Sequence, residues 1–175
     1  MNKVGNIDIP AQLKLEYFDH KITAAELEGE QYNSLCMERL DIFPYELLHY
    51  TGIAAFKPWK QPEETVPSLF AQWKNIRSEL EPLYQQRDVK AAAPLMKQGI
   101  ALCFSALFWM NEEPVTLMQW QEKTASLPFS TVNFAERMQF ILQRPALFQS
   151  FKTLEQLMIE LEKAFARSLI KKKKR

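Results

Sequence analysis

The segment from Pro94 to Met110 restricts the fold of this chain more than any other part of the sequence. Residues 99–110 form a run of twelve residues that are all apolar except Ser105. A helix built from this segment is apolar on nearly all sides, so neighbouring helices must cover it. Twelve residues are too few to cross a bilayer, which needs about 20. The segment therefore predicts a helix at the centre of a helical bundle rather than in a membrane.

The rest of the chain has the spacing of amphipathic helices. Apolar residues recur every three or four positions across residues 68–88, 133–144 and 153–170. Thr153 and Gln156 have the spacing of a capping box, which predicts that the last of these helices begins there. Only four glycines occur in 175 residues, fewer than the turns of an all-β domain require. Hydrophobic residues make up 47% of the chain and charged residues 25%, as in folded globular domains. The predicted fold is all-α: an irregular single-domain helical bundle of roughly five to eight helices around the central apolar helix.

A proline-rich stretch divides this predicted bundle. Three prolines within residues 57–67 disfavour a regular helix there, so we expect an extended connector. Pro82 is expected to kink or break the helix that begins at Ser68. The predicted organisation has four parts: an N-terminal helical segment (1–56), the connector (57–67), the main helical bundle (68–170) and a basic tail (171–175).

The basic tail places five consecutive positive charges at the end of the sequence. Its five residues are Lys171, Lys172, Lys173, Lys174 and Arg175. The whole chain has 22 Lys and Arg against 21 Asp and Glu, for a net charge of +1. Without the tail, 17 basic residues face 21 acidic ones, so the remaining body is mildly acidic. Affinity for a polyanion is therefore expected mainly in the tail.

The sequence leaves three interpretations of the tail open. It is a solvated, frayed helix end without a partner, where lysines interact favourably with the helix dipole. It contacts DNA or RNA phosphates, with weak, salt-sensitive and sequence-independent binding. It contacts an anionic lipid surface, although no lipidation motif or apolar anchor accompanies it. We favour the first interpretation, followed by nucleic acid.

Lys57, Trp59 and Lys60 in the connector are further candidates for polyanion contacts. A tryptophan between lysines is able to stack on a base or anchor a partner. The alternative, which we prefer, is that Trp59 folds back and fixes the connector to the core.

Residues suited to catalysis or metal binding are sparse. The chain has two histidines, His20 and His49. Glu46 and His49 have the Glu-x-x-His spacing of di-iron bundles, but those proteins use it twice with two further glutamates. Glu16 and His20 do not supply the second pair in that form, and a histidine packed near a helix end is the preferred interpretation. Neither a glycine-rich phosphate loop nor a G-x-S-x-G motif occurs. We predict no catalytic, cofactor-binding or metal-binding residues and no cofactor.

One polar cluster is a candidate surface site: Asn133, Glu136, Arg137 and Arg144. Asn133, Arg137 and Arg144 are four and seven residues apart, which places them on roughly one side of a helix. Asn133 and Glu136 also have the spacing of a capping box. We prefer helix capping and surface ion pairs, which contribute little stability, as the explanation of this cluster.

Three segments resemble the YpoC family of small bacterial proteins: FPYELLHY (43–50), MKQGIALCFSALFWMNEEPV (96–115) and VNFAERMQFILQRPALFQSF (132–151). The resemblance covers most of the chain from about Phe43 onward and implies one helical domain in the bacterial cytosol. It brings no activity, cofactor or functional residue with it. An association of the family with genes of DNA replication and repair slightly favours the nucleic-acid interpretation.

The expected function is a non-enzymatic protein–protein interaction or adaptor module. The alternative is an accessory nucleic-acid-binding protein that uses the basic tail, and the third candidate is a small helical enzyme or metal-binding bundle. The N-terminal sequence MNKVGNIDIP has no apolar signal region, so we expect a cytoplasmic protein. Its partner is expected to be another protein, with DNA or RNA as the alternative; a membrane partner is not expected.

Overall fold

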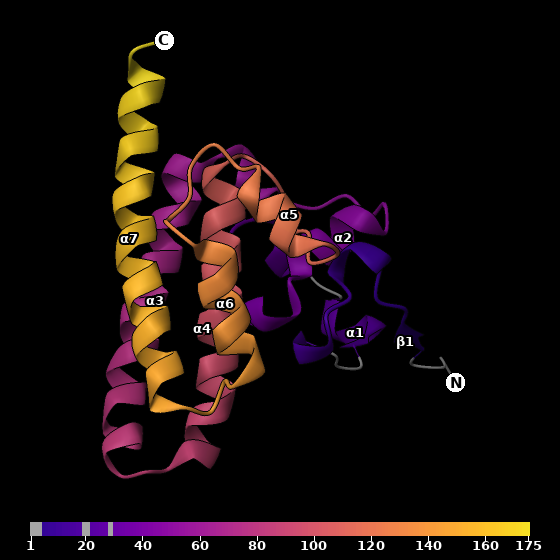
Figure 1. Cartoon of the computed structure of the whole chain (residues 1–175). Coiled ribbons are helices and arrows are strands. Elements are labelled where there is room, and N and C mark those ends of the chain that lie inside the picture. The colour runs from indigo at the N-terminus through magenta and orange to yellow at the C-terminus, as the bar shows by residue number, and fades with distance from the viewer. Residues whose placement is uncertain (1–4, 19–21, 28–29) are drawn as a thin grey trace.

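The computed structural model describes residues 5–18, 22–27 and 30–175. Within these residues nearly all of the regular secondary structure is helical (Figure 1), which confirms the predicted all-α bundle. The α-helices are α1 (Ala24–Leu27), α2 (Pro44–Tyr50), α3 (Pro62–Gln85), α4 (Val89–Met110), α5 (Trp120–Ala125), α6 (Phe134–Gln143) and α7 (Phe148–Lys173). The short 3-10 helices are η1 (Ala11–Leu13), η2 (Glu16–Phe18), η3 (Glu30–Asn33), η4 (Leu40–Ile42) and η5 (Pro58–Lys60). Strands β1 (Asn6–Ile7) and β2 (Ile22–Thr23) form one small antiparallel pair.

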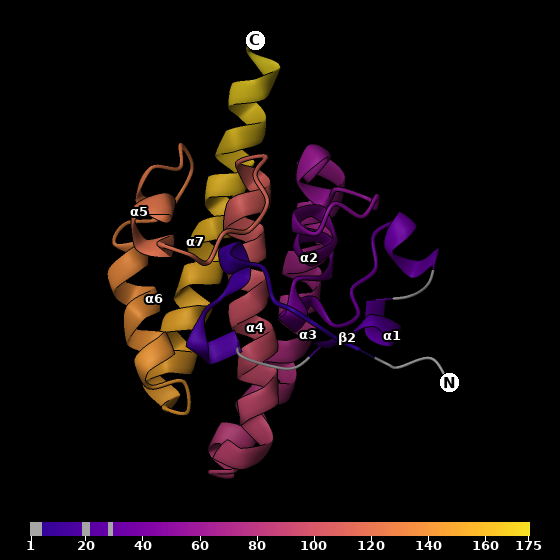
Figure 2. The ribbon, with the colours of Figure 1, turned by 90° about the vertical axis from the view of Figure 1, so that its right-hand side faces the viewer.

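Helix α4 is the centre of the protein, as its composition predicts. Every residue from Gly99 to Met110 is buried. In Figure 2, α4 lies between α5, α6 and α7 on one side and α2 and α3 on the other. By length and composition alone its 22 residues would suit a membrane span, but 67% of its most apolar window is buried inside the protein. Burial against neighbouring helices therefore accounts for its apolar character.

The long helices α3 and α7 approach α4 closely at Gly99. A Cβ atom at this position would lie 2.7 Å from Cζ3 of Trp73 on α3 and 3.1 Å from Cδ2 of Leu154 on α7. Atoms cannot pack at the shorter of these distances without a shift of the helix or the ring. Glycine at 99 therefore lets the Trp73 ring lie against the backbone of α4.

The prediction for residues 57–67 is wrong in its second half. Only the first part is a connector with the short turn η5, because α3 begins at Pro62 and runs through Pro67 and Pro82. Pro62 is in the first turn, where a helix tolerates proline. Pro67 and Pro82 are exposed, so water can solvate the carbonyl groups that they leave without a donor. For the same reason Pro82 does not end the helix.

The described part of the N-terminal segment packs onto the bundle. Its apolar side chains belong to the same core cluster as those of α3, α4 and α7. Edge-to-face aromatic contacts join the two parts. The ring centroids of Phe18 and Phe104 are 6.4 Å apart, and those of Tyr45 and Trp109 are 6.2 Å apart. The described residues thus share one hydrophobic core.

Two helix starts differ from the predicted capping boxes. Asn133 precedes α6 with a φ of 56°, and its side chain makes no capping hydrogen bond. The left-handed backbone directs the chain into the helix without help from the amide. Helix α7 begins at Phe148, not at Thr153, whose hydroxyl donates a hydrogen bond to the carbonyl of Gln149 at 2.8 Å inside the helix.

Candidate functional site

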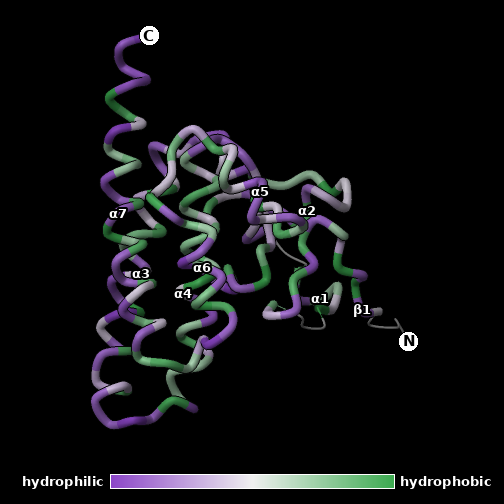
Figure 3. The backbone as a smooth tube through the Cα atoms, viewed as in Figure 1, coloured by the Kyte–Doolittle hydropathy of each residue, from purple (hydrophilic) through white to green (hydrophobic). Residues whose placement is uncertain are grey.

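The basic tail forms the last turns of α7. The helix continues to Lys173, and in Figures 1 and 2 its C-terminal end extends beyond the ends of the other helices. Figure 3 shows that the final residues are hydrophilic. Lys171, Lys173, Lys174 and Arg175 are exposed, and Lys172 is half-buried. The tail is therefore a largely solvated helix end, in which helical geometry sets the order of the lysines around the axis.

Two contacts attach the inner side of this basic end to the body of the protein. Nζ of Lys172 lies 3.3 Å from a carboxylate oxygen of Glu112, just after α4. Nζ of Lys171 lies 5.7 Å from the centroid of the Phe129 ring, a cation–π distance. The inner side of this end of α7 is thus held against the loops that follow α4 and α5.

More cations lie on the outer side of α7. Lys163, Arg167 and Lys174 are exposed, and their spacing of four and seven residues places them on one side of the helix. The neighbouring acids are engaged elsewhere, because Glu160 pairs with Arg137 on α6 and Glu162 with Lys74 on α3. The C-terminal third of α7 therefore has a positively charged outer surface.

Only two of the three candidate polyanion-binding residues in the connector are accessible. Lys57 and Lys60 are exposed, but the Trp59 side chain is only 2% exposed. Its ring lies edge to face with that of His49, with centroids 5.2 Å apart. Trp59 is therefore not available to stack on a base; it fixes η5 to the core, as the preferred interpretation holds.

The structure separates the predicted polar cluster. Asn133 and Glu136 line a shallow pocket of about 290 Å³ near the end of α5. Arg137 turns toward α7 and donates two hydrogen bonds to Glu160, at 2.7 and 3.2 Å. Arg144 is the exposed C-terminal cap of α6. Arg137 thus belongs to an ion pair between α6 and α7, and Asn133 and Arg144 lie at the two ends of α6. The four residues do not form one shared site.

Glu46 is the most unusual ionisable residue in the described part of the protein. Its side chain, on α2, is 1% exposed. Oε1 accepts a hydrogen bond from Nε1 of Trp109 at 2.6 Å and a longer one, 3.4 Å, from the backbone nitrogen of Val115. Oε2 has no hydrogen-bond partner among the described residues. Burial raises the pKa of Glu46 to about 7, although the bond from Trp109 opposes the rise. Glu46 holds α2 against the end of α4.

Glu46 and His49 contact different groups despite their helical spacing. His49 packs against the rings of Trp59 and Tyr50, each with centroids 5.2 Å away. Burial and the nearby Lys57 and Lys60 lower its pKa. Among the described residues, no three His, Cys, Asp or Glu side chains gather where they could hold a metal ion. His20, the other predicted histidine, lies outside the described residues.

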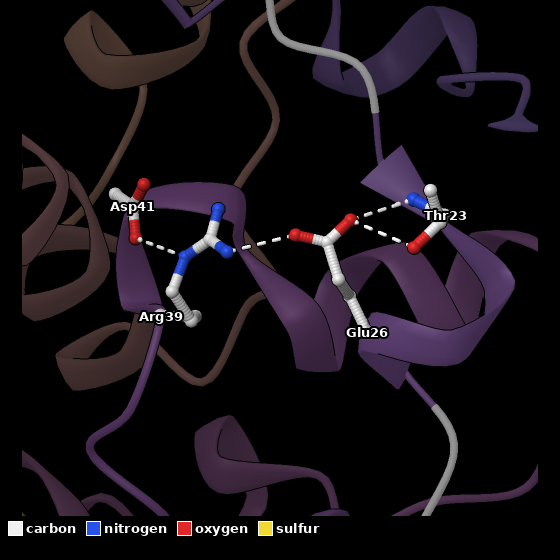
Figure 4. A network of polar contacts seen from close by, with 4 residues as sticks. All are labelled: Thr23, Glu26, Arg39 and Asp41. Carbon is white, nitrogen blue, oxygen red and sulfur yellow. Dashed lines mark hydrogen bonds and ion pairs between the residues drawn. The ribbon is translucent and has the colours of Figure 1, made fainter.

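A second polar network fixes the N-terminal segment (Figure 4). Glu26 accepts hydrogen bonds from the backbone and hydroxyl of Thr23 at 2.7 and 3.0 Å and pairs with Arg39 at 2.8 Å. Arg39 also pairs with Asp41 at 3.3 Å, beside a pocket of about 380 Å³ between η4, α3 and α4. Because Arg39 pairs with one carboxylate from each element, the network joins α1 to η4.

Sequence reasoning missed two residues at the basic end. Glu112 and Phe129 meet α7 only because the end of α4 and the loop between α5 and α6 converge there. They are 60 and 42 residues away from Lys172 and Lys171 in the chain. Such long-range contacts leave no local pattern.

Comparisons with known proteins agree with the predicted family. The YpoC-like protein family matches residues 63–173. A protein of Bacillus subtilis (strain 168), "Uncharacterized protein YpoC", is 32% identical over 138 residues, which cover 78% of this chain and 84% of the relative. No solved structure matches the chain. The family match begins at the start of α3, so the segment 43–50 lies outside it.

Proposed function

The chain belongs to the YpoC-like protein family, and we propose that it is a cytoplasmic, non-enzymatic accessory protein that binds nucleic acid through the basic end of α7. One observation carries the proposal: a projecting helical end holds consecutive cations on an otherwise acidic body. Such a charge distribution favours phosphate contacts.

The location of the ionisable groups supports a binding role over catalysis. Glu46 is enclosed by α2 and α4, and Cys103 is buried, which raises the pKa of its thiol. His49 packs against aromatic rings. Since each group has separate surroundings, we propose no nucleophile–base pair.

A protein partner, the leading expectation from the sequence, becomes the second candidate. Phe148, Ile159 and Ile170 are 55%, 42% and 57% exposed and recur every eleven residues along one side of α7. Eleven residues of helix span about 16 Å. The three side chains therefore offer single contacts to a partner rather than one continuous apolar surface.

Fluorescence anisotropy with labelled single-stranded and duplex DNA and RNA tests the proposal. The variant K171Q/K173Q/K174Q removes three exposed charges while glutamine maintains the helix and the Lys172–Glu112 pair remains. The matched control K14Q/R87Q/K90Q removes three exposed charges elsewhere. Circular dichroism verifies that both variants stay helical.

We expect the intact protein to bind at about 50 mM salt and to lose about 50-fold in affinity by about 200 mM, as four phosphate contacts on a single strand require. The α7 variant should bind about tenfold more weakly, and the control variant within about twofold of the intact protein. Equal losses in both variants, or no binding at low salt, would overturn the proposal.

A further inference from the structure

A small pocket lies on the inner side of the basic end of α7. It encloses about 180 Å³ between the C-terminal end of α4, the loop that joins α5 to α6, and α7. Its lining includes Asn111, Phe129, Ser168, Lys171, Lys172 and Arg175. Pockets for drug-sized ligands usually exceed about 300 Å³. The available space therefore suits one small unit, such as a single base, rather than a complete dinucleotide cofactor.

The aromatic wall of this pocket is firmly held. The amide nitrogen of Asn111 donates hydrogen bonds to the carbonyls of Leu107 and Phe129 at 2.7 and 2.8 Å. Its Oδ1 accepts one from the backbone nitrogen of Phe129 at 2.9 Å. These bonds fasten the loop to the end of α4, so the half-buried Phe129 ring has a defined position beside α7.

Cations form the opposite wall. Lys171, Lys172 and Arg175 follow one side of the helix, and the backbone nitrogen of Arg175 closes the last turn onto the carbonyl of Lys172 at 3.2 Å. Glu112 balances Lys172. No described acidic side chain pairs with Lys171 or Arg175, so the pocket has a net positive charge next to its aromatic ring.

An aromatic ring beside unpaired cations matches the chemistry of one nucleotide, because a base has a π-face and its phosphate is an anion. We propose that the pocket binds one unpaired nucleotide of single-stranded nucleic acid. Its base stacks on Phe129 and its phosphate contacts Lys171 and Arg175. In this arrangement the ammonium of Lys171, which lies over the ring in the free protein, moves to the phosphate.

This inference rests on the proposed function and adds a preference for single strands. A base within a duplex must leave its stack and its partner before it can enter the pocket, and this costs free energy. The exposed outer cations of α7, in contrast, bind phosphates regardless of bases. Stacking and charge can therefore be measured separately.

The test compares three probes of equal phosphate number: single-stranded oligo-dT, an abasic strand and a duplex. The variant F129L removes the aromatic face, and F129W restores one. F148L is the matched control, since Phe148 is exposed at the opposite end of α7. Thermal unfolding confirms that each variant is folded.

The intact protein and F129W should bind oligo-dT about 5- to 100-fold more tightly than the abasic strand. F129L should reduce this ratio to about one with an unchanged salt dependence, and F148L should leave it as it is. If all three probes bind equally to the intact protein, the pocket proposal fails while phosphate binding by α7 stands. If no probe binds at low salt, the proposed function fails as well.

Discussion

Glu46 and the basic end of α7 adjoin the same end of α4 but place their charges in opposite surroundings. Glu46 contacts Trp109 and the backbone of Val115 in the interior. The α7 end contacts Glu112, whose side chain is 53% exposed, and projects into water. A buried charge changes the free energy of unfolding directly, whereas exposed charges contribute little to it. At the same end of α4, the buried Glu46 therefore affects the stability of the fold, while the exposed cations of α7 are free to contact a partner.

The largest expected effect is a pH dependence of stability due to Glu46. Its pKa rises from the ordinary 4.5 to about 7 in the folded protein. Its stabilising contribution is then fully present below about pH 4.5 and is lost as the pH rises through 7, a change of about 3 kcal/mol. The variant E46Q keeps a hydrogen-bond acceptor for Trp109 but does not titrate. Urea unfolding of both proteins across this pH range should show that the free energy of unfolding of the wild type falls relative to that of E46Q as the pH rises. A difference that stays constant with pH would contradict the prediction.

The second prediction concerns Gly99 in α4, where a substitution alters packing without altering charge. G99A forces a methyl group against Trp73 and Leu154. Overpacking costs about 1–3 kcal/mol, and the better helix propensity of alanine offsets about 1 kcal/mol. We expect a net loss of at most about 2 kcal/mol in unfolding experiments and no change in affinity for single strands. A parallel loss of affinity would mean that binding depends on the packing of α4.

Loss of the half-exposed ion pair between Arg137 and Glu160 should change the free energy of unfolding less than the titration of Glu46 and more than E112Q. Hydrogen bonds from Arg137 lower the pKa of Glu160, so its stabilisation is present above the ordinary glutamate pKa and lost as the pH falls. Because solvent screens the pair, a double-mutant cycle with R137Q and E160Q should give under about 1 kcal/mol. A coupling that increases toward low pH would contradict this sign, which is opposite to that of Glu46.

The smallest effect on stability is expected for E112Q. Glu112 is exposed and pairs with Lys172, so its neutralisation should change the free energy of unfolding by less than about 0.5 kcal/mol. The same change frees one cation beside the pocket and should strengthen single-strand binding by about two- to threefold. Unfolding and anisotropy measurements on one protein sample provide both values, and weaker binding would argue against a phosphate site there.

Local sequence patterns predict the parts of the fold that depend on local physics. The central position of α4 follows from its apolar residues 99–110, because no other environment suits such a helix in water. The start of α3 at Pro62 was missed, because the sequence does not show that the carbonyl left without a donor by Pro67, inside the helix, reaches solvent. The capping role of Thr153 was also wrong, because its hydroxyl bonds equally well inside a helix.

The candidate sites were less predictable because their partners are distant in the chain. The five terminal cations are visible in the sequence, but the contact of Lys171 with Phe129 requires the positions of α4 and the following loops. Glu46 was noticed only through its spacing with His49. Its actual partner, Trp109, is 63 residues away, and that contact is what turns a potential metal ligand into a buried anchor.

NMR titration of the isotope-labelled protein with a short single-stranded oligonucleotide tests the central claim most directly. The account predicts amide shift changes along residues 163–175, around Glu112 and at Phe129, with none around Glu46 on α2. Changes confined to α2 or η5, or an absence of changes at the end of α7, would contradict it.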